Sequence, residues 1–515
     1  MMRFHTGRHG HGPRQGRRFF LGLAGFFLLL PAMLSAQAAE SDLSRFIEQG
    51  MELWHVPGMA VTVVSTNEVL FQKGFGTTSI DHGLAVDEHT LFANASTTKA
   101  MVVAGVLMLA DEGLLSLDDT VSKHLPEVHF NTALLNEQVT IRDLLAHRTG
   151  LPSTDFWTFF MNMPLEEQLQ RLSAVAPENP LRTGFIYQNT LFEVAGLVIE
   201  RVSGQRWDRF LQARLWQPIG MTETFGSRSQ APESLARVEP HDFTDGSLHR
   251  VDYSLPPDRV DAAGSVWSSI RDMGLWAQFL LRDGVTADGR RLISEAGMAD
   301  MFRPQTLIPA DQFYPVARLY QPNWRSYGLG WFQQDFQGRK IDFHTGSLDG
   351  LIALIGLDQA GDRAMVIMGN RDHAEMRHAA LLEVMDRTPD TERRDWNREV
   401  WNLYRENHES GRNSWAELEA SRLERTKPSL PRDAYTGHYE NAAMGKVVIE
   451  LHGQEMLLKT GAKNLPMRHW HLDTFLVEFE QWDLREFAAF RVTPDGTVRG
   501  MELFGYDFSL ITSRD

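Results

Sequence analysis

The chain has 515 residues, of which 43% are hydrophobic and 23% are charged, as in ordinary globular proteins. This length exceeds one ordinary hydrophobic core, so we expect roughly two or three domains. The net charge of −16 argues against nucleic acid or an anionic membrane surface as a partner. The absence of cysteine excludes disulfides, thiol nucleophiles and cysteine metal sites, but it does not decide the compartment.

The N-terminus has the layout of an export signal. Residues 1–18 contain five arginines and no acidic residue, and an apolar run follows from Phe19 to Leu34. Ala36-Gln37-Ala38 then offers a cleavage site of the A-x-A type. We therefore predict a signal peptide over residues 1–38 and a mature protein that is periplasmic or secreted, with no stable membrane span. Arg17-Arg18 resembles a twin-arginine signal, while the general secretory route stays open as the alternative.

Residues 39–375 alternate between strand-like and helix-like segments. Polar turns and capping residues separate these segments: Thr140 and Asp143 form a capping box, and Gly204 ends an apolar helix. The predicted elements are a hairpin of residues 59–64 and 69–74, helices over 96–113, 191–202 and 270–281, strands over 327–332 and 340–343, and a hairpin of residues 351–357 and 363–368.

The last quarter of the chain changes character twice. Residues 376–432 are highly charged with few β-branched residues, which predicts a helical linker. Residues 433–515 alternate short β-rich runs with turns at Gly453 and at Pro494-Asp495-Gly496, which predicts a small β-sandwich or barrel. His469 and His471 alternate on one of these runs, and we interpret them as surface residues rather than metal ligands.

The stretch from Asn94 to Lys99 opens an apolar helix and contains a serine and a lysine three residues apart. On a helix, Ser96 and Lys99 lie on one face with adjacent side chains. A serine hydroxyl needs a neighbouring base to become a nucleophile, and a desolvated lysine can serve as one. Alone, the pair is weak evidence, and a helix-start serine with a solvated lysine is the favoured interpretation of it.

Two further motifs stand downstream in order, Tyr187-x-Asn189 and His344-Thr345-Gly346, the latter followed by Ser347. With Ser96-x-x-Lys99, they resemble the serine β-lactamase and penicillin-binding-protein superfamily, most closely its class C branch with the D-aminopeptidases and related esterases. This resemblance covers about residues 41–375. It implies an α/β (α+β) fold, with an antiparallel sheet flanked by helices, an all-α region, and the active site between them. The terminal β domain resembles the lipocalin-like appendage of some relatives, where it can restrict the substrate.

The resemblance also implies roles for these residues. Ser96 would form an acyl-enzyme, with Lys99 and Tyr187 sharing the proton transfers. A nearby lysine ammonium should lower the pKa of the Tyr187 phenol, and which of the two is the base stays open. Asn189 would bind Lys99 and a substrate amide, while the segment His344, Thr345, Gly346 and Ser347 would bind substrate, with the backbone N–H groups of Ser96 and Ser347 as the oxyanion hole.

The third motif departs from many β-lactamases, which carry lysine where this chain has His344. A histidine is mostly neutral at pH 7 and would be a weaker, pH-dependent clamp for a substrate carboxylate. We therefore expect an exported serine hydrolase that acts on amide or ester bonds of small peptides, including D-residue peptides, or on carboxylic esters. A β-lactamase or D,D-carboxypeptidase is the alternative enzyme, and a penicillin-binding protein without turnover is the alternative of another class. No metal or cofactor is expected, and the oligomeric state is left open.

Overall fold

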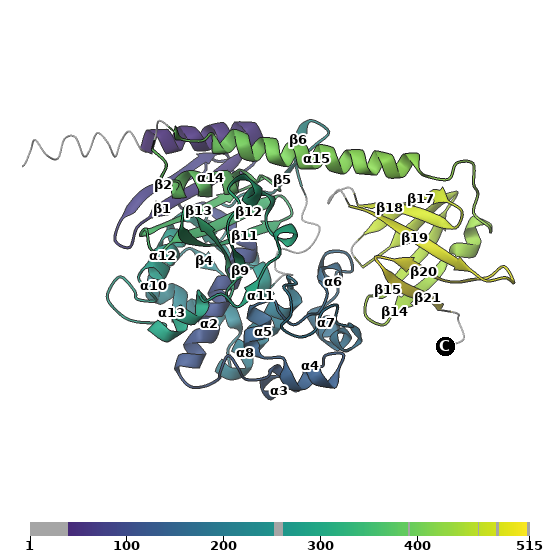
Figure 1. The fold of residues 1–515 in the computed structure, drawn as a ribbon, viewed down its shortest axis with the longest axis horizontal. Coiled ribbons are helices and arrows are strands. Elements are labelled where there is room, and N and C mark those ends of the chain that lie inside the picture. The colour runs from purple at the N-terminus through teal and green to yellow at the C-terminus, as the bar shows by residue number, and fades with distance from the viewer. Residues whose placement is uncertain (1–39, 252–260, 390–391, 462, 480–483, 512–515) are drawn as a thin grey trace, which may run out of the picture. The chain divides into compact units, whose positions relative to one another are not determined.

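The computed structural model describes residues 40–251, 261–389, 392–461, 463–479 and 484–511 (Figure 1). The predicted signal peptide, residues 1–38, lies outside the described residues. Within the described ranges, no helix combines the length and the apolar composition that a bilayer crossing requires.

An eight-stranded antiparallel sheet forms the centre of the larger domain. Its strand order is β2-β1-β13-β12-β11-β10-β9-β8, and both predicted hairpins, β1–β2 and β12–β13, are confirmed. The strands are β1 (Gly58–Val64), β2 (Val69–Gly76), β8 (Thr306–Leu307), β9 (Arg325–Tyr327), β10 (Phe332–Phe336), β11 (Arg339–Leu348), β12 (Leu351–Asp358) and β13 (Arg363–Gly369).

Helices cover both faces of this sheet, as expected for strands buried on both sides (Figure 1). α12 (Ile270–Leu281) packs on β1 and β13, and it has the predicted bounds. α14 (Met376–Met385) packs on β12 and β13 and is almost entirely buried, although its sequence lies in the range that we assigned to the charged linker.

The predicted strand over residues 327–332 is wrong. β9 ends at Tyr327 and β10 begins at Phe332, and the two strands pair with each other in antiparallel register. The residues between them form a tight turn, in which Gly330 has a φ of +75°. A side chain is disfavoured in that conformation, and glycine is not.

The helical region is built around α2 (Thr98–Asp111), which is buried from Thr98 to Leu109. Its sequence is apolar on all sides, and it packs against helices on several sides. The capping box of Thr140 and Asp143 is confirmed, as is the left-handed Gly204 after α8. The α-helices here are α3 (Val121–His124), α4 (Ala133–Gln138), α5 (Ile141–Leu145), α6 (Asp155–Phe159), α7 (Leu165–Arg171), α8 (Thr190–Ser203), α9 (Trp207–Leu211), α10 (Gln217–Ile219), α11 (Asp261–Gly264) and α13 (Glu295–Met301).

Short elements complete this region. They are the 3₁₀ turns η1 (Ala95–Thr97), η2 (Leu172–Ala174), η4 (Arg228–Gln230), η5 (Ala310–Gln312) and η6 (Pro315–Leu319), the π-helix η3 (Gln212–Trp216), and two small sheets made of β3 (Leu91–Ala93), β7 (Trp267–Ser269) and β4 (Thr224–Phe225), and of β5 (His241–Thr244) and β6 (Ser247–Arg250).

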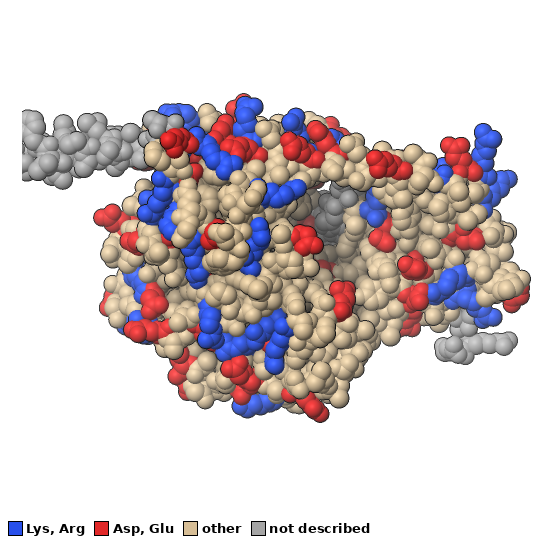
Figure 2. Space-filling model, viewed as in Figure 1, with Lys and Arg blue, Asp and Glu red and all other residues tan. Residues whose placement is uncertain are grey.

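After α14, the mostly exposed helix α15 (Trp396–Ala420) leads to η8 (Arg432–Tyr435) and a closed barrel. The barrel strands are β14 (Gly437–Asn441), β15 (Gly445–His452), β16 (Glu455–Lys459), β17 (Asn464–His471), β18 (Thr474–Phe479), β19 (Leu484–Val492), β20 (Val498–Leu503) and β21 (Tyr506–Ile511). Pairing of β14 with β21 closes the barrel, so that each of its described strands has two neighbours. On the face shown in Figure 2, acidic and basic side chains are interspersed in small groups over the surface.

Candidate active site

Ser96 and Lys99 lie at the start of the buried helix, Ser96 in η1 and Lys99 in the first turn of α2. Ala95 has a φ of +46°, a conformation that a non-glycine residue adopts at a cost and that often marks a functional turn. Lys99 is fully buried, and its Nζ atom lies 3.1 Å from Ser96 Oγ, 2.7 Å from Asn189 Oδ1 and 2.8 Å from the carbonyl oxygen of Ala263. The structure therefore brings together three of the residues that the sequence singled out.

Burial lowers the pKa of Lys99 to about 7, although the carboxyl groups of Asp155 and Glu193 favour its charged form. A neutral lysine has two hydrogens and one lone pair. The carbonyl oxygens of Asn189 and Ala263 can only accept, so they take the two hydrogens. The lone pair is then left for the remaining neighbour, the hydroxyl of Ser96.

Tyr187 lies against this lysine, with Lys99 Nζ 4.8 Å from the centroid of its ring. Burial raises the pKa of Tyr187 well above its ordinary value, although a hydrogen bond with Ser96 acts in the opposite direction. The expected lowering of this pKa is therefore wrong. Desolvation of the phenolate is the largest cause of this rise, and Tyr187 stays a protonated donor.

Asn189 is held at both ends of its amide. Its Oδ1 accepts from Lys99, and its Nδ2 donates to Asp155 Oδ1 at 2.9 Å. The other carbonyl partner of Lys99 is held from behind, because Glu193 on α8 accepts the backbone N–H groups of Ala262 and Ala263 at 3.0 and 3.3 Å. Asp155 and Glu193 were missed in the sequence because no local pattern marks them.

β11 brings the third motif against Ser96. A Cβ atom at Gly346 would lie 2.5 Å from the carbonyl oxygen of Asn94 and 2.9 Å from the backbone nitrogen of Ser96, so only glycine allows this approach. Beside it, Arg377 donates to the carbonyl oxygen of Gly346 at 2.6 Å and to Ser347 Oγ at 2.9 Å. Arg377 in turn pairs with buried Glu375, which fixes this end of β11.

His344 is buried, and both of its ring nitrogens have protein partners. Nδ1 lies 2.7 Å from the carbonyl oxygen of Thr345, and Nε2 lies 2.9 Å from the hydroxyl of Tyr327. Burial lowers the pKa of His344 to about 3, and the charge on Lys99 acts in the same direction. His344 is thus a neutral residue inside the protein, so the pH dependence expected of it is wrong, while its contact with substrate stays a prediction. Thr345 faces Tyr314, since their hydroxyls lie 2.5 Å apart.

His147 is fully buried among the rings of Tyr187, Phe192 and Tyr327. Its Nδ1 accepts the backbone N–H of Gln188, so it supports the second motif. Among the described residues, no group of three or more His, Cys, Asp or Glu side chains is arranged to hold a metal ion. His469 and His471 are half-buried on β17 and belong to no such group.

Two family models match the chain. The model described as Beta-lactamase matches residues 43–387, and the model described as a domain of unknown function, DUF3471, matches residues 421–514. Among curated proteins, the unguisins hydrolase ungD' of Aspergillus campestris is 27% identical over 510 residues, covering 90% of this chain and 89% of that relative.

Solved structures of similar fold include penicillin-binding-protein and amidase relatives. The octameric penicillin-binding protein homologue from Pyrococcus abyssi has a TM-score of 0.60 at 19% identity, covering 92% of this chain and 99% of its own. The D-amino acid amidase from Ochrobactrum anthropi SV3, complexed with L-phenylalanine amide, has a TM-score of 0.54 at 20% identity, covering 72% of this chain and 99% of its own. At these identities the structures support the fold alone, and none of the matches distinguishes a class C branch.

Proposed function

The chain belongs to the Beta-lactamase family, and we propose that it is a serine hydrolase that forms an acyl-enzyme on Ser96 and cleaves amide bonds of small peptides or carboxylic esters. The observation that carries this proposal is the environment of Lys99. A buried amine with a pKa of about 7, whose two hydrogens have obligate acceptors, offers its lone pair to Ser96 Oγ at 3.1 Å. Such a group is a base matched to neutral pH.

Acylation then follows from the positions of three side chains. Ser96 Oγ attacks the carbonyl carbon of the substrate and gives its proton to Lys99 Nζ. When the bond to the leaving group breaks, the leaving nitrogen takes the proton of the Tyr187 hydroxyl. The Lys99 ammonium returns a proton to Tyr187, so that the acyl-enzyme forms with both groups in their starting states.

Deacylation reverses the direction of proton flow. A water molecule attacks the ester carbon of the acyl-enzyme and gives a proton to Lys99, and Ser96 Oγ leaves with that proton. In both halves the backbone N–H groups of Ser96 and Ser347 stabilise the oxyanion, since Gly346 lets β11 approach η1 closely. Removing one such donor typically costs about 10²–10³ in rate.

We propose a neutral amide with D-residues as the substrate class. The name of the D-amino acid amidase, at 20% identity, supports an amide with D-residues, and the name of the unguisins hydrolase, at 27% identity, supports hydrolysis. The neutral His344, with both nitrogens engaged, supports a substrate that needs no carboxylate clamp. The same observation argues against efficient turnover of penicillins and of peptides with a free terminal carboxylate.

We propose that the protein acts outside the cytoplasm. Support for export comes from the sequence of residues 1–38, with its five arginines, apolar run and A-x-A site. Expression of the full chain, followed by fractionation and N-terminal sequencing of the product, tests this: a cytoplasmic protein that retains residues 1–38 would contradict it.

Intact-mass spectrometry with a fluorophosphonate and, separately, a penicillin tests the function. We expect one fluorophosphonate adduct that Ser96→Ala does not form, and steady-state hydrolysis of a D-amino acid amide. A single stoichiometric burst without turnover, together with a persistent penicillin adduct, would make the chain a penicillin-binding protein instead. Equal labelling of Ser96→Ala would reject Ser96 as the nucleophile.

A further inference from the structure

The segment from α6 to α7 connects the second motif with the barrel. At its start, Asp155 accepts the side-chain amide of Asn189 at 2.9 Å, and Asn189 in turn accepts from Lys99. Asp155 is thus one side chain away from the base that the proposed function requires. It also fixes the amide of Asn189, because a carboxylate accepts only and therefore turns the NH₂ group toward itself and the oxygen toward Lys99.

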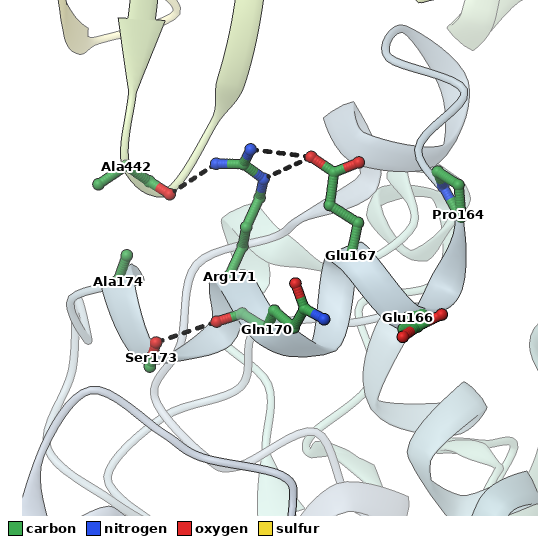
Figure 3. Close-up of a pocket in the computed structure, with 8 residues that line it drawn as sticks. All are labelled: Pro164, Glu166, Glu167, Gln170, Arg171, Ser173, Ala174 and Ala442. Carbon is green, nitrogen blue, oxygen red and sulfur yellow. Dashed lines mark hydrogen bonds and ion pairs between the residues drawn. The ribbon is translucent and has the colours of Figure 1, made fainter. Parts of the chain in front are cut away.

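The opposite side of the same segment packs on the barrel. The ring centroids of Phe156 and Phe504 lie 4.6 Å apart, and those of Phe160 and Phe479 lie 4.7 Å apart. Hydrogen bonds between described residues also join the two parts: Trp157 Nε1 donates to the carbonyl oxygen of Ala443 at 2.9 Å, Thr460 Oγ1 to that of Phe160 at 2.6 Å, and Arg171 Nη1 to that of Ala442 at 2.9 Å. The last bond spans one side of a polar hollow of about 550 Å³ (Figure 3).

Buried polar groups tie this segment to the helix that follows the second motif. Thr154 Oγ1 lies 2.9 Å from Thr190 Oγ1, which donates to Gln168 Oε1 at 3.0 Å. Gln168 Nε2 donates to Thr158 Oγ1 at 3.2 Å. Movement of α6 would therefore break a satisfied buried network, which costs more than breaking exposed contacts.

We propose that Asp155 is a positioning residue for Lys99, acting through Asn189, and that the barrel holds it in place through α6. The proposal rests on the proposed function, since it assumes that Lys99 is the base. In this proposal the barrel supports catalysis indirectly. It packs on α6, Asp155 of α6 accepts from Asn189, and Asn189 accepts from Lys99.

The charges around Lys99 give the direction of the expected effect. The negative charges of Asp155 and Glu193 favour its charged form, although burial raises the pKa of both carboxyl groups. Burial also keeps His147 and His344 neutral and Tyr187 protonated, by lowering the pKa of each histidine and raising that of the phenol. Asp155→Asn keeps an acceptor for Asn189 but removes one negative charge. The pKa of Lys99 should therefore fall, because its ammonium loses a stabilising neighbour.

The test measures the rate of fluorophosphonate labelling against pH for the full chain. We expect the labelling rate of Asp155→Asn to rise at a lower pH than that of the parent and to reach a similar plateau. Asp155→Ala should show the same shift and also a lower plateau, because Asn189 loses its acceptor. If the rising part of the pH–rate profile lies at the same pH in both variants as in the parent, the role of Asp155 is overturned.

A matched pair of variants tests the part played by the barrel. Trp157→Phe removes the hydrogen bond to Ala443 and keeps an aromatic ring. Trp216→Phe makes the same change at a buried indole whose Nε1 has no hydrogen-bond partner among the described residues. We expect the plateau of the labelling rate to be lower for Trp157→Phe and unchanged for Trp216→Phe. Equal plateaus in the two variants would overturn the proposed role of the barrel. A parent enzyme whose labelling rate shows no midpoint near pH 7 would instead reject Lys99 as the base, the part of the proposed function on which this inference rests, while loss of labelling in Ser96→Ala tests the hydrolase function separately.

Discussion

The Nε2 atom of His344 lies 2.9 Å from the hydroxyl of Tyr327, so this ring nitrogen already has a partner inside the protein. The other nitrogen, Nδ1, faces the carbonyl oxygen of Thr345, so it carries the proton and Nε2 accepts from Tyr327. With its pKa held at about 3 by burial, His344 gains no charge at the pH values where ordinary histidines titrate.

Preference for a substrate carboxylate should therefore not depend on pH. We expect the ratio of kcat/KM for a peptide with a free terminal carboxylate to that for its carboxamide to stay constant between about pH 5 and 8. Steady-state kinetics on the two matched substrates measures this ratio. If the carboxylate substrate gains as the pH falls through the ordinary histidine range, His344 does charge and bind it.

The phenol of Tyr187 should matter for poor leaving groups and not for good ones. Tyr187→Phe removes the proton donor, so hydrolysis of an unactivated amide should fall by about 10²–10⁴. A nitrophenyl ester should be affected far less, because nitrophenolate leaves without a proton. Parallel losses on the amide and the ester would show that Tyr187 acts in the attack step as well.

Gly346 should tolerate no side chain. In Gly346→Ala, the Cβ would meet two backbone atoms, the oxygen of Asn94 and the nitrogen of Ser96, and neither can give way cheaply. We expect kcat to fall by about 10²–10³, the usual effect of losing one oxyanion donor. Gly411→Ala on exposed α15, where no described atom beyond its chain neighbours and the backbone of its own helix lies within 4 Å of the added carbon, is the control and should keep full activity. Equal activity of the two variants would mean that the close approach of β11 does not form the oxyanion hole.

The buried Lys99 should make the free energy of unfolding depend on pH. Its pKa lies at about 7 in the folded protein and near 10.5 in the unfolded chain, so the unfolded state binds more protons between these values. The free energy of unfolding of the parent should therefore rise with pH in this window relative to Lys99→Met, by at most about 1.4 kcal/mol per pH unit. The free-energy cost of burying the Lys99 ammonium is fully present below about pH 7 and decreases as the pH rises above that value.

Denaturant unfolding of both proteins at several pH values gives this difference. Taking the difference between parent and variant removes the contribution of every other titrating group that the substitution leaves undisturbed. Two stability curves that run parallel from pH 7 to 10.5 would mean that Lys99 keeps an ordinary pKa in the folded state.

Local patterns predicted the parts of this fold that depend on neighbouring residues. The two hairpins of the large sheet, the capping box at Thr140 and the bounds of α12 all follow from turns, caps and periodicity over a few residues. Ser96 and Lys99 were found for the same reason, since three positions separate them in one helical turn.

Features that depend on burial or on distant partners could not be predicted. The pKa of Tyr187 rises because desolvation outweighs the lysine charge, and burial is a property of the tertiary structure. Asp155 reaches Asn189 across 34 positions, and no periodicity links them. α14 was assigned to the charged linker because it directly precedes the charged stretch and contains Arg377, but Arg377 pairs with Glu375 inside the protein.

The pH dependence of Ser96 labelling by a fluorophosphonate tests the central claim most directly, because it isolates the attack step from product release. With Lys99 as the base, the rate should rise about tenfold per pH unit on the acidic side and level off above a midpoint near pH 7. A rate that keeps rising into the range where phenols ionise would make Tyr187 the base and contradict the account.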